Sequence, residues 1–408
     1  MTKLIGPFNQ ILTMDGLRPQ GHLSDRELEI VEDGGIIVDK GHILAIGRYA
    51  DLDDFAGERE EIDFPSVALP GFVDTHTHIC FAGSRAGEYA QKLDGHSYQE
   101  IASKGGGILS TVKNTRAASF EELLLGLLNR TKDLLARGVT TCEVKSGYGL
   151  NIEDEVKMLS VIQNASSNEP VSLIPTCLAA HTTPPEFSSS SEYLNYLIQN
   201  LFPLLKKDQL TNRIDIFVEE GAFSIEEAEK YLLAAKQEGF DLVIHGDQFS
   251  VGGSELAARV GALSLDHCEQ TEVEQAKLLS EAGVIPIVLP GASIGLGMKF
   301  ASARMLLDEE LPLVIASDWN PGSAPMGDLL TQAAILGAFE KLTMAEILSA
   351  ITIRAARALN LHDRGILKTG MRADFSVFPT DDYQEILYHQ GTLTPQCVFT
   401  GGEMAYVI

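Results

Sequence analysis

The sequence predicts an α/β protein: a (β/α)₈ (TIM) barrel with a small composite β domain formed by the two ends of the chain. Three observations support this prediction. Apolar strand-like runs alternate with amphipathic helical runs through the central part of the 408-residue chain, a pattern typical of a parallel sheet with crossover helices. Eight such strand-like runs occur, and most end in polar residues. Short β-like runs, separated by Gly and Asp turns, occupy both ends of the chain.

The terminal segments share one character. Near the start, LIGPFNQILTM and GGIIVDKGHILAIG are typical of a small antiparallel sheet, and near the end ADFSVFP and QCVFTGGEMAYVI have the same pattern. We therefore expect residues 1–65 and 361–408 to form one β domain, and residues 66–360 to form the barrel. Helical runs such as SFEELLLGLLNRTKDLLARG and SIEEAEKYLLAAKQEG are expected to pack around the barrel.

The eight candidate strands of the barrel are SVALPGFVDTHTH, VTTCEVKSG, VSLIPTCLAAH, RIDIFVEEG, FDLVIHGDQ, ALSLDHCE, VIPIVLPG and LPLVIASDWNPG. Seven of them end in polar residues: His76 and His78, Lys145, His181, Glu219 and Glu220, His245, His267, and Asp318. A strand that turns polar where it leaves the core would explain one or two cases, but not seven. Active sites of such barrels lie at the carboxyl ends of several strands at once, so we expect a site there.

The charge balance limits the partners of this chain. Lys and Arg number 31 against 57 Asp and Glu, for a net charge of −26. Repulsion makes nucleic acid and anionic membranes poor partners, and an anionic substrate would need a local cation. Five cysteines without a CxxC pair are expected to stay reduced. No signal peptide or membrane-spanning apolar run is evident, so a cytoplasmic location is expected.

The motif DTHTH places His76 and His78 two residues apart at the end of an apolar strand. Side chains at i and i+2 of a strand share a face, so both imidazoles can reach one metal ion. The motif alone is weak, since two surface histidines can also stand at a strand end. His245 and Asp318 end two further apolar strands. Three imidazoles and one carboxylate predict a site for one divalent ion, Zn²⁺ or Fe²⁺, and argue against Mg²⁺ or Ca²⁺.

These ligand positions, with His267 on the sixth strand, resemble those of the amidohydrolase superfamily, whose members hydrolyse cyclic amides and related bonds. Residues 81–119 and the segments EVKSGYGL, LAAHTTPPEF, IFVEEGAFS, HGDQFS and SDWNPGSAP are similar to the imidazolonepropionase family. The resemblance implies hydrolysis of 4-imidazolone-5-propanoate to N-formimidoyl-L-glutamate in histidine degradation. It also implies a homodimer, and it assigns the metal ligands as His76, His78, His245 and Asp318.

The implied substrate is a planar heterocycle that carries a carboxylate, and the resemblance also assigns residues to bind it. Arg85 would hold the carboxylate in a bidentate fork, although an exposed loop arginine is the simpler interpretation from sequence alone. Tyr148 and His181 would contact the substrate, where a packing tyrosine and a core histidine are the alternatives. The carboxylate would also be held by side-chain and backbone donors in a segment that could equally be an ordinary turn: Asn320, Gly322 and Ser323.

Gln248 lies three residues after His245, where relatives carry Glu or Gln, and is expected to bind substrate. Because Gln cannot accept a proton, the acid–base role is expected to fall to Asp318 or His267. Of these two residues, His267 is also suited to polarise the substrate carbonyl. Lys145 is expected to be a structural or supporting residue rather than a carbamylated bridge between two metals.

Other functions stay open from the residues alone. GASIG at 291–295 matches the GxSxG nucleophile elbow, and Asp318 and His362 follow Ser293 in the order of a serine hydrolase. That mechanism would leave the DTHTH histidines and His245 without a role. Relatives usually have an aromatic pair where this chain has Ser293-Ile294, so the seventh loop departs from the family. A hydrolase of another cyclic amide and a non-catalytic barrel are the remaining alternatives.

Overall fold

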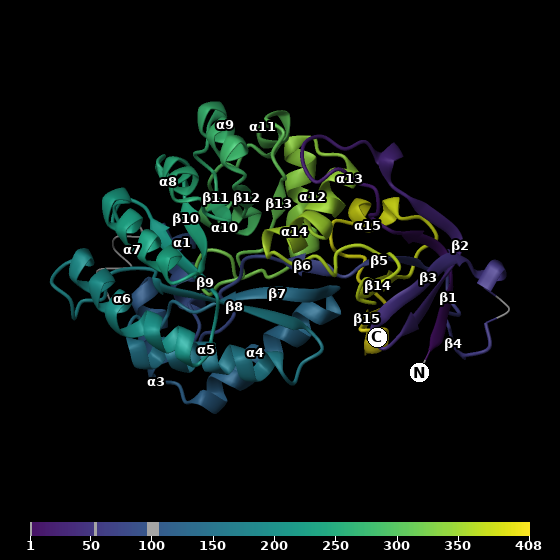
Figure 1. Cartoon of the computed structure of the whole chain (residues 1–408), viewed down its shortest axis with the longest axis horizontal. Helices are drawn as coiled ribbons and strands as arrows, with labels where there is room; N and C mark the ends of the chain where they lie inside the picture. The colour runs from purple at the N-terminus through teal and green to yellow at the C-terminus, as the bar shows by residue number, and fades with distance from the viewer. Residues whose placement is uncertain (1, 53–54, 96–105) are drawn as a thin grey trace.

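The computed structural model describes residues 2–52, 55–95 and 106–408. It contains two eight-stranded sheets, one in the barrel and one in a separate β domain that carries both chain termini (Figure 1). Helices surround the barrel sheet, which lies to the left of the β domain in the figure. Residues 96–105, which belong to the segment 81–119 that carries part of the family resemblance, lie outside the described residues.

The barrel sheet is parallel, and its strands follow one another in chain order. They are β6 (Phe72–Asp74), β7 (Val139–Lys145), β8 (Ser172–Ala180), β9 (Arg213–Val218), β10 (Asp241–Gly246), β11 (Ser264–His267), β12 (Ile285–Val288) and β13 (Val314–Ile315). A parallel bridge between Thr77 and Trp319 joins the segments that follow the first and last strands. The sheet is therefore nearly closed, which confirms the predicted (β/α)₈ barrel.

Most helices pack one apolar face against this sheet. Serine or threonine caps with a reciprocal glutamate start several of them, as Ser119 and Glu122 do for α4. The helices are α1 (Ala86–Leu93), α3 (Ile108–Ala117), α4 (Phe120–Ala136), α5 (Ile152–Ser166), α6 (Ser190–Lys207), α7 (Ile225–Gln237), α8 (Gly253–Val260), α9 (Val273–Ala282), α10 (Pro290–Leu296), α11 (Ala303–Asp308), α12 (Leu329–Glu340), α13 (Met344–Ala350), α14 (Ile353–Ala358) and α15 (Gln384–Tyr388). Across the described ranges, none is long and apolar enough to cross a membrane.

The second sheet combines both ends of the chain, as predicted. In spatial order its strands are β16 (Glu403–Val407), β15 (Cys397–Thr400), β14 (Phe375–Phe378), β5 (Val67–Pro70), β1 (Lys3–Leu12), β2 (Ile30–Asp39) and β3 (His42–Arg48), with β4 (Glu58–Glu61) paired to β1. The sheet is not wholly antiparallel, because β4 and β5 both run parallel to β1. Phe375 stacks on Phe399 with 4.5 Å between ring centroids, in the core of this domain.

The single strand predicted over SVALPGFVDTHTH is in fact two strands in different sheets. Val67–Pro70 pairs with β1 and β14, whereas Phe72–Asp74 starts the barrel. The chain changes sheets at Gly71, where a Cβ would lie 2.2 Å from Thr140 Oγ1. Only glycine fits this close approach of two segments. The DTHTH histidines consequently lie just beyond the end of β6.

Candidate active site

Four buried side chains meet at the carboxyl ends of the barrel strands. His76 Nε2 lies 3.2 Å from His78 Nε2, which lies 3.4 Å from His245 Nε2. Asp318 Oδ1 lies 3.5 Å from His76 Nε2 and 3.4 Å from His78 Nε2. None of the four residues is more than 3% exposed. The structure therefore brings together the four predicted metal ligands, which lie up to 242 residues apart in the sequence.

Two buried carboxylates orient the rings of this cluster. His76 Nδ1 lies 2.6 Å from Asp266 Oδ2, and His245 Nδ1 lies 3.0 Å from Asp215 Oδ1. An ionised carboxylate can only accept, so each Nδ1 carries the proton and donates it. Each Nε2 then keeps its lone pair and faces the other side chains of the cluster. Such carboxylate–histidine pairs fix the ring and raise its strength as a ligand.

Lys145 joins the two carboxylates beneath the cluster. Its Nζ lies 2.8 Å from Glu143 Oε1, 2.8 Å from Asp215 Oδ2 and 3.4 Å from Asp266 Oδ2, and all four residues are fully buried. Burial opposes the charged amine, but attraction to the three carboxylates outweighs it and raises the Lys145 pKa. Although burial works the other way, the charge of Lys145 lowers the Asp266 pKa to about 2. These contacts agree with the predicted supporting role of Lys145.

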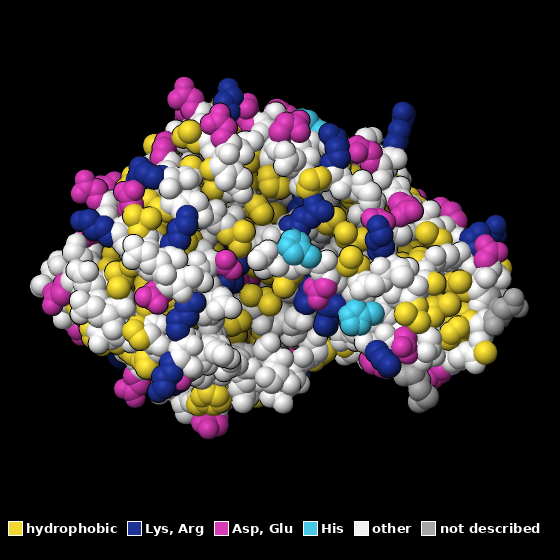
Figure 2. Space-filling view, in the orientation of Figure 1, with side chains coloured by type: hydrophobic (Ala, Val, Ile, Leu, Met, Phe, Trp, Pro, Cys, Tyr) yellow, Lys and Arg dark blue, Asp and Glu magenta, His cyan; other side chains and the backbone are white. Residues whose placement is uncertain are grey.

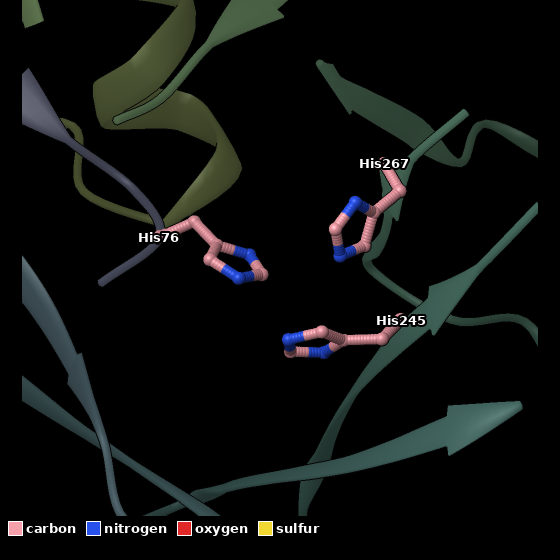
Figure 3. Close-up of side chains that lie close together, drawn as sticks. All are labelled: His76, His245 and His267. Carbon is pink, nitrogen blue, oxygen red and sulfur yellow. The ribbon is translucent and has the colours of Figure 1, made fainter. Parts of the chain in front are cut away.

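The donor atoms of the cluster fit a divalent transition metal. Three imidazole nitrogens and a carboxylate oxygen are the ligands of Zn²⁺ or Fe²⁺ sites, whereas Mg²⁺ and Ca²⁺ take oxygen ligands. The ligand atoms of His76, His78 and Asp318 all lie within 4.8 Å of one another, as do those of His76, His245 and His267. Figure 3 shows the rings of the second group, carried by three different segments, turned toward one another.

His267 and Asp318 adopt an uncommon backbone conformation. Their φ angles are 95° and 51°, in a region that residues other than glycine rarely occupy. Such a conformation costs about 1–3 kcal/mol and persists where the surroundings impose it, often at functional sites. The His267 ring lies 5.5 Å from that of His245 between centroids, beside the ligand cluster. Its Nδ1 lies 3.5 Å from Glu269 Oε2.

Tyr148 and His181 form an aromatic wall beside His78. The His181 ring stacks nearly parallel to that of His78, 5.4 Å away, and the Tyr148 ring lies 5.6 Å from His181. His181 Nδ1 lies 3.1 Å from the Gly147 carbonyl, which can only accept, so Nε2 is left as an acceptor. Burial, assisted by the neighbouring His78, lowers the His181 pKa to about 3. A neutral ring therefore faces the site.

The loop that carries Tyr148 is held by Glu155, a residue that the sequence did not single out. Its carboxylate accepts hydrogen bonds from the backbone N–H groups of Gly147, Gly149 and Leu150, at 3.0, 2.8 and 2.8 Å. Glu155 lies on the buried face of α5, one turn before Met158 and Leu159. An acid at a core-facing position of an amphipathic helix is the sequence signal that could have identified it.

Arg85 lies at the start of α1, beside the loop that follows β13. Its Nε and Nη2 both lie 2.9 Å from Glu88 Oε2. A Cβ added to Gly322 would lie 2.3 Å from Arg85 Nη1, so the guanidinium touches this backbone. The side chain is only 17% exposed, unlike a free loop arginine. The structure thus brings Arg85 to the segment that was predicted to share the substrate carboxylate.

Asn320 organises the loop after Asp318. Its Oδ1 accepts from the N–H groups of Gly322 and Ser323, at 2.7 and 2.8 Å, and its Nδ2 donates to the Asp318 carbonyl. The two N–H groups predicted to hold a carboxylate are thus engaged by Asn320, in the manner of an Asx turn. Binding of a carboxylate by these groups requires that they exchange Asn320 for the substrate.

The segment after β10 is ordered by Glu219, which lies at the end of β9. Its carboxylate accepts from the N–H groups of Gln248 and Phe249, both at 2.8 Å, and from the Ser250 hydroxyl at 2.6 Å. Gln248 is 5% exposed and follows His245 by three residues. Glu219 therefore fixes the backbone that presents Gln248 near the site.

The structure does not assemble the serine-hydrolase alternative. Ser293 lies in α10, and its Oγ donates to Glu269 Oε1 at 3.1 Å rather than to a histidine. His362 is exposed after α14, with Nε2 3.2 Å from Asn360 Oδ1. No hydrogen bond links Ser293, Asp318 and His362, all of which lie within the described ranges.

Comparison with known proteins agrees with this geometry. The model of the amidohydrolase family matches residues 67–405. The imidazolonepropionase of Bdellovibrio bacteriovorus is 37% identical, over 99% of this chain and 96% of that relative. The imidazolonepropionase of Idiomarina loihiensis is 40% identical, over 90% of this chain and 91% of that relative.

Solved structures share the fold at low sequence identity. Guanine deaminase of E. coli covers 100% of both chains with a TM-score of 0.73 and 15% identity. A zinc-bound adenosine deaminase from Xanthomonas campestris covers 99% of this chain and 93% of its own, with a TM-score of 0.72 and 18% identity. Because the family model matches residues 67–405 and these relatives match over nearly the full length of the chain, the chain belongs to the imidazolonepropionase family of amidohydrolases.

Proposed function

We propose that this chain hydrolyses 4-imidazolone-5-propanoate to N-formimidoyl-L-glutamate, a step of histidine degradation. The observation that carries the proposal is the meeting of three histidine Nε2 atoms and the Asp318 carboxylate within 3.5 Å of their neighbours, with the half-buried cation Arg85 against the backbone of Gly322 in the loop after Asp318. The substrate has one group for each of these features: a cyclic amide for the histidine cluster and a carboxylate for Arg85. The relatives that match over most of their length are imidazolonepropionases.

One divalent metal ion, zinc or iron, would be held by His76, His78, His245 and Asp318. When bound, such an ion lowers the pKa of a water molecule and polarises a carbonyl group. Asp266 and Asp215 keep two of these imidazoles oriented through Nδ1. The remaining chemistry is the movement of protons and the placement of the substrate, and both fall to side chains of this chain.

Asp318 is the proposed general base. It takes the proton of the attacking water, and Ser323 Oγ, 3.5 Å from Asp318 Oδ2, lies at its outer oxygen. His267 faces the cluster from β11, so we assign it to the substrate carbonyl, where a donated hydrogen bond stabilises the developing negative charge. The ring C–N bond then breaks, and Asp318 or His267 returns a proton to the leaving nitrogen.

Arg85 is the proposed partner of the substrate propanoate, with the Asn320–Ser323 segment as its neighbour. Tyr148 and His181 form the wall against which the planar ring would lie, and Gln248 would contact the same substrate. We also propose a homodimer, as the family suggests, and a cytoplasmic location. The five cysteines are all buried and free, which agrees with the reduced state expected there.

The test is turnover of 4-imidazolone-5-propanoate by protein purified without added metal, with elemental analysis of the same sample. We expect about one zinc or iron per chain and formation of formimidoyl-glutamate. Chelation should abolish turnover, and the removed metal should restore it. If the metal-loaded protein does not turn over this substrate but hydrolyses another cyclic amide, the proposed substrate is wrong and the proposed metal site still stands.

A further inference from the structure

A second charged pocket lies at the opposite end of the barrel from the histidine cluster. Its volume is about 220 Å³, and it is lined by the segments that lead into β12 and β13, together with α14. Two arginines of α14, Arg354 and Arg357, line it, with Ser280 and Glu310 among its polar neighbours. Asp318 follows the other end of β13, so the pocket and the histidine cluster are separated by the length of the barrel.

Arg354 is buried without a full set of hydrogen-bond acceptors. It is 1% exposed, and its Nη2 donates to the Gly21 carbonyl at 2.8 Å. Its Nε and Nη1 have no hydrogen-bond partner. A buried donor without an acceptor is costly, and more so when it is charged, which is why such groups are normally paired. Burial lowers the Arg354 pKa to about 10, which leaves the group charged at neutral pH.

Arg357 adds a second positive charge three residues along the same helix. Residues at i and i+3 share one side of a helix, and both side chains line the same pocket. Over the described ranges, neither guanidinium has a carboxylate at ion-pair distance, although the exposed Glu310 borders the pocket. Figure 2 shows dark-blue Lys or Arg side chains in the region where Figure 1 places α14. Two arginines without a carboxylate in ion-pair contact are unusual in a chain of net charge −26, although Glu346 and Glu27 act on Arg354 from a greater distance.

We propose that this pocket binds a small oxyanion, of the phosphate or carboxylate class, with Arg354 and Arg357 as its charged donors. Guanidinium groups match the planar and tetrahedral oxygen arrangements of both classes, and one group can give two parallel hydrogen bonds. The pocket, with a volume of about 220 Å³, has room for phosphate or a short dicarboxylate.

Titration calorimetry of the full chain at low salt, with sodium phosphate and with glutarate as separate probes, tests the proposal. Arg357→Gln should weaken binding at least tenfold, because it removes a charge-assisted hydrogen bond. Glu310→Gln should strengthen binding about threefold, because it removes a nearby negative charge. Arg26→Gln, on an exposed turn outside the pocket, is the matched control and should bind like the wild type.

Either probe could also enter the active site, so each titration is repeated in Arg85→Ala. Binding that survives Arg85→Ala and is lost in Arg357→Gln supports the proposal, and the probe that binds identifies the anion class. Binding that is lost in Arg85→Ala and unchanged in Arg357→Gln overturns it, as does the failure of both probes to bind. Arg354→Gln is expected to abolish binding. If that variant does not fold, the Arg357 and Glu310 variants decide the outcome alone.

Discussion

The two ends of the barrel differ in the sign of their buried charge. At the carboxyl ends of the strands, Lys145 faces three carboxylates, and Asp318 adds a fourth beside the histidines. At the amino ends, Arg354 keeps two donors without a partner. The first end has an excess of negative charge, which suits a metal cation and a developing imidazolium. The second has an excess of positive charge, which suits an anion. The sign of the charge that lacks a close partner, rather than polarity alone, therefore indicates what each end can bind.

The largest expected effect is at the metal ligands. His245→Ala should remove one of four converging donors and lower both metal content and turnover, the latter by ~10³-fold or more, because activation of water depends on the ion. Elemental analysis and steady-state kinetics on the same sample measure both. His362→Ala, at an exposed histidine after α14, is the control and should change neither. Full metal content and activity in His245→Ala would show that the site is misplaced.

Lys145→Met tests whether the charge network stabilises the fold. The substitution leaves Glu143, Asp215 and Asp266 buried with no cation between them, and breaking a buried pair in this way costs about 3–5 kcal/mol. The free energy of unfolding, from denaturant titration of the metal-free protein, is the measurement. Lys277→Met, at an exposed lysine, should change it by less than about 0.5 kcal/mol. A loss as small as that for Lys145→Met would mean that the three carboxylates do not depend on this amine.

Arg85→Ala should lower kcat/KM for 4-imidazolone-5-propanoate by about 10- to 150-fold, the effect of losing a charge-assisted hydrogen bond worth ~1.5–3 kcal/mol. Arg85→Lys should recover only part of it, because an ammonium cannot form the planar fork. Metal content should not change. The kcat/KM for an analogue without the propanoate should not change in Arg85→Ala. If the analogue loses as much, Arg85 acts through its contact with Glu88 and the carboxylate is bound elsewhere.

Asp215→Asn separates orientation of a ligand from ligation itself. The amide oxygen can still accept from His245 Nδ1, but it carries no charge, so the imidazole becomes a weaker ligand. We expect the metal affinity to fall about 10- to 100-fold, measured by competition with a chelator. Asp241→Asn, at the exposed first residue of β10, the strand that carries His245, should leave the affinity unchanged. An unchanged affinity in both variants would contradict a role for the buried carboxylate.

From the sequence, the four residues that meet in the cluster were easier to predict than the carboxylates that hydrogen-bond to the histidines, and the reason is physical. A polar residue that ends an apolar run marks the point where a strand leaves the barrel, so His245 and Asp318 stood out. Asp215 lies inside β9 between two apolar residues, and Asp266 lies inside β11 between Leu265 and His267; the partners of both come from other strands. A charge in the middle of a fully buried strand was the available signal, since it requires a buried partner. Nothing local showed that the chain changes sheets at Gly71, because strand pairing is decided by distant segments.

The smallest expected effect is at the amino ends of the strands, where a substitution should change stability and leave catalysis alone. Arg364 Nη1 donates to Thr141 Oγ1 of β7 at 3.0 Å, and its Nε donates to Asp363 Oδ1 at 2.8 Å. Arg364→Gln should lower the free energy of unfolding by about 1 kcal/mol at neutral pH, as expected for one hydrogen bond and a partly exposed ion pair. The kcat/KM should stay within about twofold of the wild type.

The pH dependence of that loss distinguishes the ion pair from packing. The hydrogen bond from Arg364 holds the Asp363 pKa below its ordinary value. A carboxyl group with a lowered pKa stabilises the fold above the ordinary value, about 3.9, and loses this contribution as the pH falls through the lower folded value. Denaturant titrations of the wild type and of Arg364→Gln should therefore give different free energies of unfolding at neutral pH. Near pH 3 the two free energies should become similar. A difference that persists at low pH would assign the effect to the bond with Thr141. A fall in kcat/KM would instead couple this end of the barrel to the metal site.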